Sequence, residues 1–229
     1  MKISMLFAMM SVYAWLATIN MGAPPKVDSD MERHPVRIAC IGDSITQGAG
    51  VENPKENAYP VQLAKALEEN YHVRNFGVSG TTLMKRGDFP YWKTAAFRKA
   101  LNFRPEIVII MLGTNDTKPQ NWKYKEDFVK DYRELAKQFS NLSTKPHIYF
   151  CHPCFVVKEG AFGIVESGVL EQIPLIDDLA KELNCITIDI HGVFKLKPEL
   201  IPDNVHPNAE GAKLMMETIL EALHKNDVR

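Results

Sequence analysis

One serine, one histidine and one aspartate in the sequence have the types and spacing that nucleophilic catalysis requires. A serine hydroxyl attacks a carbonyl when a base accepts its proton, an acid orients that base, and hydrogen-bond donors receive the developing negative charge. Ser44 follows an apolar run in the segment CIGDSITQG (40–48), so we expect it where a strand ends. Asp203 precedes His206 by three residues, which lets its carboxylate reach imidazole Nδ1 and leaves Nε2 to face the serine. This pattern predicts a Ser44 nucleophile, a His206 base and an Asp203 partner.

Candidate donors for the negative charge follow other apolar runs. They are the backbone N–H groups of Ser44 and Gly80 and the side-chain amide of Asn115. A glycine at position 80 also lets a substrate approach the main chain closely. The same residues have structural alternatives, because Ser44 could only cap a helix and Asn115 could only lie in a turn. Asp189 and His191, two residues apart at the end of an apolar run, form a rival acid–base pair.

Apolar runs alternate with amphipathic segments along the chain, and they must position these residues. The pattern predicts strands at 36–41, 72–76, 107–112, 147–151 and 186–190, and helices at 59–70, 91–103, 125–139, 169–183 and 208–224. Such alternation is typical of an α/β fold, here a three-layer α/β/α sandwich with a parallel sheet of about five strands. Ligands of such folds bind beyond the carboxyl ends of the strands, so the candidate residues should meet at that edge. Pro174 either kinks the helix at 169–183 or lies where that helix begins.

Composition and the remaining motifs argue against several other functions. The 229 residues carry 27 Lys+Arg and 28 Asp+Glu, with a formal charge of −1, and no basic stripe, so we expect no nucleic-acid partner. Segment 42–48 lacks the spacing and lysine of a P-loop and the middle glycine of a dinucleotide fingerprint. Cys151 and Cys154 have redox-pair spacing but follow a late strand, which leaves a thiol oxidoreductase as an alternative. The histidines outside these motifs lack a second ligand at metal spacing, and we expect no metal or organic cofactor.

The first residues have the pattern of an export signal. Lys2 precedes an apolar stretch at 3–19, and small residues and two prolines follow it. This pattern predicts a signal peptide at 1–23 with cleavage near Ala23, a linker at 24–35 and one domain at 36–229. The alternative is an uncleaved membrane anchor, for which the apolar run is barely long enough. We expect an exported protein, periplasmic or extracellular, without stable membrane insertion after processing.

Four segments, in this order and with these spacings, resemble the SGNH-hydrolase family, also called GDSL esterases and lipases. They are GDSITQG (42–48), NFGVSG (75–80), GTND (113–116) and DNVH (203–206). The resemblance extends from about 36 to about 220, which is nearly all of the expected mature chain. It implies a flavodoxin-like α/β/α fold with about five parallel strands and a cofactor-independent serine esterase.

The resemblance also implies a role for individual residues. Ser44 is the nucleophile and first oxyanion donor, Gly80 and Asn115 are the second and third donors, His206 is the general base, and Asp203 is its partner. In this reading Asp43 braces the loop and does not react, and Gln47 serves the turn after Ser44.

Within the family, segments 90–97 (PYWKTAAF) and 113–122 (GTNDTKPQNW) resemble exported bacterial sialate or carbohydrate O-acetylesterases. The expected substrate is a short-chain, acetyl ester of a carbohydrate, oligosaccharide or sialic acid. Trp92, Trp122 and Phe155 fall in predicted loops at the strand ends, where their flat rings could stack on a sugar. The alternatives are a lysophospholipase or thioesterase of the same family, and a non-catalytic glycan-binding protein on the same fold. The sequence leaves the oligomeric state open.

Overall fold

The computed structural model of this chain describes residues 34–158 and 161–226. The predicted signal peptide at 1–23, and all but the last two residues of the predicted linker at 24–35, lie outside the described residues. Among the residues that are described, no helix has both the length and the apolar character needed to cross a bilayer.

The described residues form a five-stranded sheet in which all neighbours are parallel, with the order β2-β1-β3-β4-β5. The strands are β1 (Val36–Gly42), β2 (Tyr71–Gly77), β3 (Ile107–Met111), β4 (His147–Cys151) and β5 (Ile186–Ile188). Every residue of the central strand β3 is buried, which explains why its sequence shows no polar alternation. β5 ends two residues earlier than predicted, because the Asp189 carboxylate caps the next helix by accepting a hydrogen bond from the Gly192 N–H.

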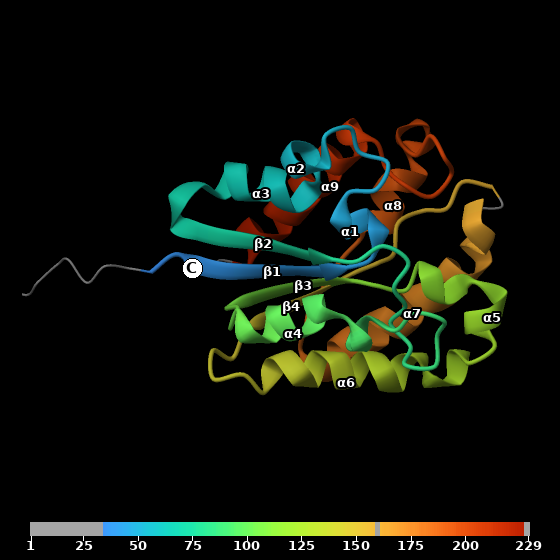
Figure 1. Cartoon of the computed structure of the whole chain (residues 1–229), viewed down its shortest axis with the longest axis horizontal. Coiled ribbons are helices and arrows are strands. Elements are labelled where there is room, and N and C mark those ends of the chain that lie inside the picture. The colour runs from blue at the N-terminus through green and yellow to red at the C-terminus, as the bar shows by residue number, and fades with distance from the viewer. Residues whose placement is uncertain (1–33, 159–160, 227–229) are drawn as a thin grey trace, which may run out of the picture. The chain divides into compact units, whose positions relative to one another are not determined.

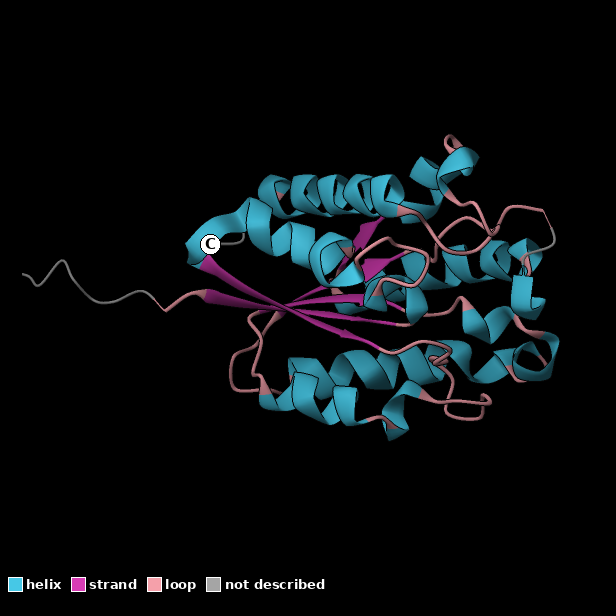
Figure 2. Ribbon diagram, turned by 45° about the horizontal axis from the view of Figure 1, so that its top comes forward, coloured by secondary structure: helices cyan, strands magenta, loops and turns pink. Residues whose placement is uncertain are grey.

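Helices cover both faces of this sheet, as the two views in Figure 1 and Figure 2 show. The α-helices are α1 (Ser44–Gln47), α2 (Pro54–Asn57), α3 (Tyr59–Leu67), α4 (Ala95–Asn102), α5 (Pro119–Trp122), α6 (Phe128–Ser140), α7 (Glu166–Leu183), α8 (Ile190–Lys195) and α9 (Ala209–Lys225). In Figure 1, α3 and α9 lie on one side of the sheet, and α4 and α6 lie on the other.

Each face of the sheet has its own apolar core. Alternate residues of β1 divide between the two: Ile38 and Cys40 pack with α3 and α9, whereas Ala39 and Ile41 pack with α4, α6 and α7. Burial of this apolar surface is the main term that stabilises such a sandwich. The predicted three-layer α/β/α sandwich with a parallel five-stranded sheet is confirmed.

Several helix ends differ from the sequence prediction. The segment predicted as one helix at 91–103 is a 3₁₀ turn followed by α4, because Thr94 caps α4 by accepting a hydrogen bond from the Phe97 N–H. The helix predicted at 169–183 begins earlier, at Glu166, and Pro174 lies inside it. At the other end of the chain, Asn208 caps α9 as its type suggests, since its side chain accepts from the Gly211 N–H.

Candidate active site

Ser44 is the first residue of α1, directly after β1 ends at Gly42. Asp43 provides the helix cap, because its Oδ1 accepts a hydrogen bond of 3.0 Å from the Ile45 N–H. Ser44 is therefore not needed as a cap, and its hydroxyl is available for other contacts. The turn is tight enough to require glycine at position 42, where a methyl group would lie 2.0 Å from Thr46 Oγ1.

His206 and Asp203 lie in the loop before α9, and the loop brings them to Ser44. Asp203 Oδ1 accepts hydrogen bonds from the Val205 N–H (2.9 Å) and the His206 N–H (2.6 Å). Its Oδ2 lies 2.7 Å from His206 Nδ1, and His206 Nε2 lies 2.9 Å from Ser44 Oγ. The structure thus brings together the three residues that the sequence analysis selected, in the order hydroxyl, imidazole, carboxylate.

The hydrogen bonds to Asp203 also favour its charged form. Partial burial opposes ionisation, but the contacts from the His206 main chain, the His206 imidazole and the Val205 N–H together hold the pKa of Asp203 below its usual range. An ionised carboxylate at Nδ1 fixes the imidazole tautomer whose Nε2 can accept a proton from the serine.

Ser44 opens into a cavity of about 240 Å³. The residues lining it come from the ends of β1, β2 and β3 and from two loops: Ser44, Ala49, Ser79, Gly80, Asn115, Lys118, Phe162, Ile164 and His206. The three residues predicted to donate hydrogen bonds to the oxyanion therefore line one cavity together with the imidazole. Gly80 has a φ of +80°, a backbone conformation that glycine adopts without strain.

Asn115 is buried and its side-chain amide is oriented by neighbours. Its Nδ2 lies 3.1 Å from the Thr81 carbonyl oxygen and 3.4 Å from Asp43 Oδ2. The first contact is a normal hydrogen bond, and the second is long enough to be weak. Asn121 fixes the Asn115 main chain by donating to its carbonyl oxygen at 2.9 Å.

Two buried carboxylates brace the loops around the serine. Asp116 is inaccessible to solvent and accepts 2.8 Å hydrogen bonds from the N–H groups of Leu83 and Met84, which ties the loop after β2 to the end of β3. Burial raises the pKa of Asp43 to about 6 and that of Asp116 to about 7, against the hydrogen bonds that favour the charged forms. The expectation that Asp43 braces the loop agrees with these contacts.

The sequence predicted that Gln47 serves only the turn after Ser44, but its side chain also makes a contact far along the chain. Its Oε1 accepts a 2.7 Å hydrogen bond from the Ser79 N–H and a 2.6 Å hydrogen bond from the Ser79 hydroxyl. Gln47 thus connects α1 to the loop that carries Gly80. The sequence offered no signal for this contact, because the two residues belong to different strand ends.

Trp92, Trp122 and Phe155, which were predicted to bind a sugar, are not among the residues that line this cavity. The Trp92 indole donates to the Leu83 carbonyl oxygen at 2.8 Å, and the Trp122 indole donates to Glu171 at 3.1 Å. Both rings pack against the core on the α6 side of the sheet, and Phe155 packs against the core on the other side. All three residues are partly buried in this packing, which the sequence pattern could not distinguish from full display in a loop.

The rival acid–base pair is also not formed. Asp189 Oδ1 lies 3.1 Å from His152 Nδ1, whereas His191 Nε2 lies 2.7 Å from Glu166 Oε1. Asp189 and His191 thus have different partners, because Asp189 caps α8 and His191 is the second residue of that helix.

The four cysteines are free thiols, and three of them, Cys40, Cys151 and Cys154, are buried. Burial raises the pKa values of the Cys151 and Cys154 thiols far above the ordinary range. Because thiol chemistry uses the thiolate, the redox interpretation of this pair is not supported. Within the described ranges, no group of three or more histidine, cysteine, aspartate and glutamate side chains is arranged to hold a metal ion.

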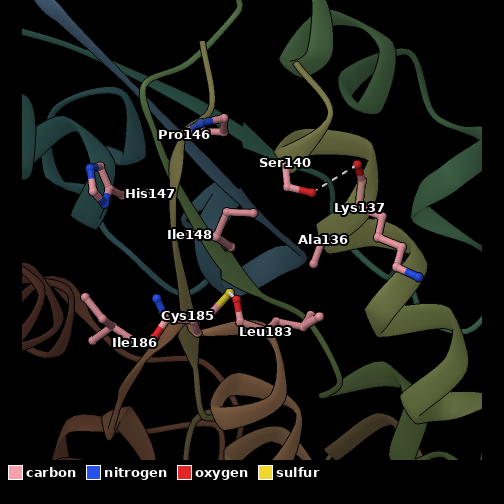
Figure 3. Close-up of a pocket in the computed structure, with 10 residues that line it drawn as sticks. Ala136, Lys137, Ser140, Pro146, His147, Ile148, Leu183, Cys185 and Ile186 are labelled. Carbon is pink, nitrogen blue, oxygen red and sulfur yellow. Dashed lines mark hydrogen bonds between the residues drawn. The ribbon is translucent and has the colours of Figure 1, made fainter. Parts of the chain in front are cut away.

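A second cavity of about 180 Å³ lies at the amino ends of β4 and β5 (Figure 3). Its lining includes His147, Ile148, Cys185 and Ile186 from the strands and their approaches, and residues of α6. None of the residues predicted to act in chemistry lines it.

The fold and the site define a class of protein: an α/β/α sandwich with a serine, histidine and aspartate in contact at the carboxyl edge of a parallel sheet. Residues 40–214 match the model of the GDSL-like lipase/acylhydrolase family, and the chain belongs to this family.

Known proteins similar to this chain include an acetylxylan esterase from Xylanibacter ruminicola, which is 35% identical over 228 residues. The match covers 91% of this chain and 45% of that protein, so the chain spans a little less than half the length of this relative. Among solved structures, a two-domain esterase active on acetylated mannans has a TM-score of 0.65 at 24% identity, covering 85% of this chain and 50% of the other. A carbohydrate acetylesterase from Sinorhizobium meliloti has a TM-score of 0.66 at 20% identity, covering 83% and 99%. These two structures share the fold.

Proposed function

We propose that this protein hydrolyses acetyl esters of carbohydrates through an acyl-enzyme on Ser44. The observation that carries the proposal is the continuous contact from Asp203 through His206 to Ser44 Oγ, at 2.7 and 2.9 Å, at a cavity that Gly80 and Asn115 also line. Membership of the acylhydrolase family and the likeness to an acetylxylan esterase support the same reaction.

In the first half-reaction, Ser44 Oγ attacks the ester carbonyl carbon while His206 Nε2 accepts the hydroxyl proton. The carbonyl oxygen becomes an oxyanion that the N–H groups of Ser44, Gly80 and Asn115 stabilise. The Asn115 amide has two N–H groups, and its weak 3.4 Å contact with Asp43 is the one that an oxyanion can replace. The tetrahedral intermediate then expels the alcohol, which takes its proton from His206.

In the second half-reaction, water attacks the acetyl group on Ser44, and His206 again accepts the proton. The bond between the acyl carbon and Ser44 Oγ breaks, the hydroxyl recovers its proton from His206, and acetate leaves. Asp203 stays ionised throughout and stabilises the imidazolium that forms in each step.

The size of the cavity favours a short acyl group. Its volume of about 240 Å³ is below the roughly 300–1,000 Å³ of pockets that enclose drug-sized ligands. The lining includes the small Ala49 and the buried Ile164, which are apolar as an acyl group requires. A lysophospholipase or thioesterase would need space for a longer chain.

A series of p-nitrophenyl esters tests this proposal. Acetate should be hydrolysed fastest, with kcat/KM falling steeply from butyrate to octanoate, and Ser44→Ala should reduce the acetate rate by at least about a thousandfold. Preference for octanoate would indicate a lysophospholipase or thioesterase. Equal rates above background in the wild type and the Ser44→Ala variant would refute Ser44 as the nucleophile, and the absence of hydrolysis above background in both would favour a non-catalytic glycan-binding protein.

Export belongs to the same proposal. The sequence pattern at 1–23 is that of a signal peptide, and an exported enzyme would meet carbohydrate polymers outside the cytoplasm. Expression of the full chain in a bacterial host, followed by cell fractionation and N-terminal sequencing, tests it. Export predicts protein outside the cytoplasm that begins near residue 24, whereas an intact N-terminus in the membrane fraction would indicate an anchor.

A further inference from the structure

Two exposed aromatic rings lie beside the cavity that contains Ser44. Among the described residues, the large apolar side chains that remain exposed are Phe89 (45%), Phe162 (68%), Leu170 (50%) and Leu196 (82%). Both aromatic members of this group lie next to residues that line the cavity. An aromatic ring that stays in water does not contribute the stabilising free energy that burial would give. Exposed rings next to a site therefore indicate a binding role.

Phe162 lines the cavity, and its ring centroid is 5.7 Å from that of His206, with an angle of 59° between the planes. Its φ of +64° is in the left-handed region, which is unfavourable for a bulky residue. The turn that holds it is anchored, because the Ile164 N–H donates to the Ala161 carbonyl oxygen and Ile164 is buried. The fold therefore maintains both backbone strain and an exposed ring at this point, which suggests a functional reason.

Phe89 lies against the other side of the site. A methyl group at Gly80 would be 3.8 Å from Phe89 Cδ1, so the ring is next to a proposed oxyanion donor. The backbone of Phe89 is fixed, since its carbonyl oxygen accepts a 2.9 Å hydrogen bond from the Thr82 N–H. The residue before it, Asp88, is exposed and charged, so a polar group lies next to this ring in the chain.

We propose that Phe162 and Phe89 bind two sugar rings of one oligosaccharide, with the acetylated sugar at Phe162. This inference rests on the proposed function and narrows its preferred substrate to an acetylated oligosaccharide chain. His206 protonates the leaving alcohol, so the sugar that carries the acetyl group must lie next to His206, and the Phe162 ring is at that position. Phe89, beyond Gly80, then contacts a further sugar of the same chain.

The surroundings of the rings favour a sugar over an acyl chain or a lipid surface. An aromatic face packs against the C–H side of a sugar ring while the hydroxyl groups stay in water or bind polar neighbours. Polar side chains are available, because Lys118 and Ser79 line the same cavity. A lipid would need a continuous apolar surface, whereas Lys118 and Ser79 line the cavity beside Phe162, and the exposed Asp88 precedes Phe89.

The test compares acetylated xylo-oligosaccharides of two to six sugars with ethyl acetate, which has no ring, by following acid release at constant pH. The variants are Phe162→Ala, Phe89→Ala and Phe162→Trp, with Leu196→Ala as the matched control, an exposed apolar residue that does not line the cavity. For each alanine variant at positions 162 and 89, the ratio of kcat/KM for the hexasaccharide to that for ethyl acetate should fall by about three- to tenfold. Phe162→Trp should recover the ratio, and Leu196→Ala should leave it unchanged.

Calorimetric titration of Ser44→Ala with acetylated xylohexaose measures binding without turnover. Adding Phe162→Ala or Phe89→Ala to this variant should raise Kd by about three- to tenfold. Unchanged ratios and unchanged Kd values would overturn the inference even if the wild type is an active esterase. An equal loss with an octanoate ester in place of the oligosaccharide would also overturn it, by assigning the rings to an acyl chain. If the wild type has no esterase activity but the two phenylalanine variants still raise Kd as expected, only the proposed function is refuted.

Discussion

Replacing Asp203 by asparagine should separate the chemistry of the site from its folding. Asp203 Oδ1 accepts from two backbone N–H groups, and an asparagine oxygen can keep both hydrogen bonds. The asparagine NH₂ then takes the place of Oδ2, which lies 2.7 Å from His206 Nδ1. Because NH₂ can only donate, Nδ1 must become an acceptor, and the proton moves to Nε2. Nε2–H faces Ser44 Oγ at 2.9 Å and can no longer accept its proton.

The structure gives the size of each effect. The wrong tautomer, together with the lost charge beside the imidazolium, reduces kcat by about 10⁴ in a buried triad. The Asp203 side chain is 42% exposed, so solvent screens its charge and we expect a loss of about 10²- to 10⁴-fold. The same exposure limits the effect on the free energy of unfolding to below about 1 kcal/mol. Since the pKa of Asp203 is lowered in the folded state, its contribution to stability is present above about pH 4 and is lost as the pH falls through the folded pKa.

The assay is hydrolysis of p-nitrophenyl acetate at about pH 7.5, well above the pH range in which Asp203 takes up a proton. Thermal unfolding is measured on the same samples. Asp189→Asn is the matched control, because Asp189 also pairs with an imidazole, that of His152 at 3.1 Å, and does not line the cavity. The control should keep kcat within about twofold of wild type. Asp203→Asn with more than a tenth of the wild-type kcat and a wild-type Tm would refute the proposed role of this carboxylate.

Three further predictions follow from other contacts. Gln47→Ala removes both hydrogen bonds to Ser79 and should lower kcat for p-nitrophenyl acetate by about tenfold with a smaller change in KM; an unchanged kcat would show that this contact does not position the donor loop. Burial raises the pKa of Asp116 to about 7, so the folded chain holds a proton that the unfolded chain releases, and the contribution of Asp116 to the free energy of unfolding should decrease as the pH rises from about 4 to about 7. Urea unfolding at several pH values should show this decrease in the wild type and a weaker one in Asp116→Asn, and equal slopes would contradict it. Iodoacetamide should leave esterase activity intact under native conditions because Cys151 and Cys154 are buried thiols with strongly raised pKa values; rapid inactivation with modification of either cysteine would count against that expectation.

Local spacing determined one part of the candidate site. The segment DNVH (203–206) places a carboxylate within one turn of an imidazole, and the Asp203 side chain closes that turn on the Val205 and His206 N–H groups. Such contacts depend on neighbours in sequence, so the sequence alone predicted the pair. The strands, the order of strand and helix, and the parallel sheet could be predicted for the same reason, because apolar periodicity is also a local property.

Long-range contacts determined the rest. Ser44 and His206 are 162 residues apart in sequence, and they meet because β1 lies inside a parallel sheet whose carboxyl ends share one edge. The contact of Gln47 with Ser79 and the proximity of Phe89 to Gly80 arise at the same edge and have no sequence signature. Phe155 and the two tryptophans, whose types favoured a sugar-binding surface, pack partly buried against the two cores.

The sequence by itself thus determined the fold class, the serine turn and the acid–histidine pair, since each depends on residues close together in the chain. Only the tertiary structure decided which rings reach the site. Phe162 faces the cavity through a left-handed backbone conformation held by the burial of Ile164. Whether an aromatic side chain is displayed or buried depends on the packing of distant elements, and a pattern of residue types does not contain that information.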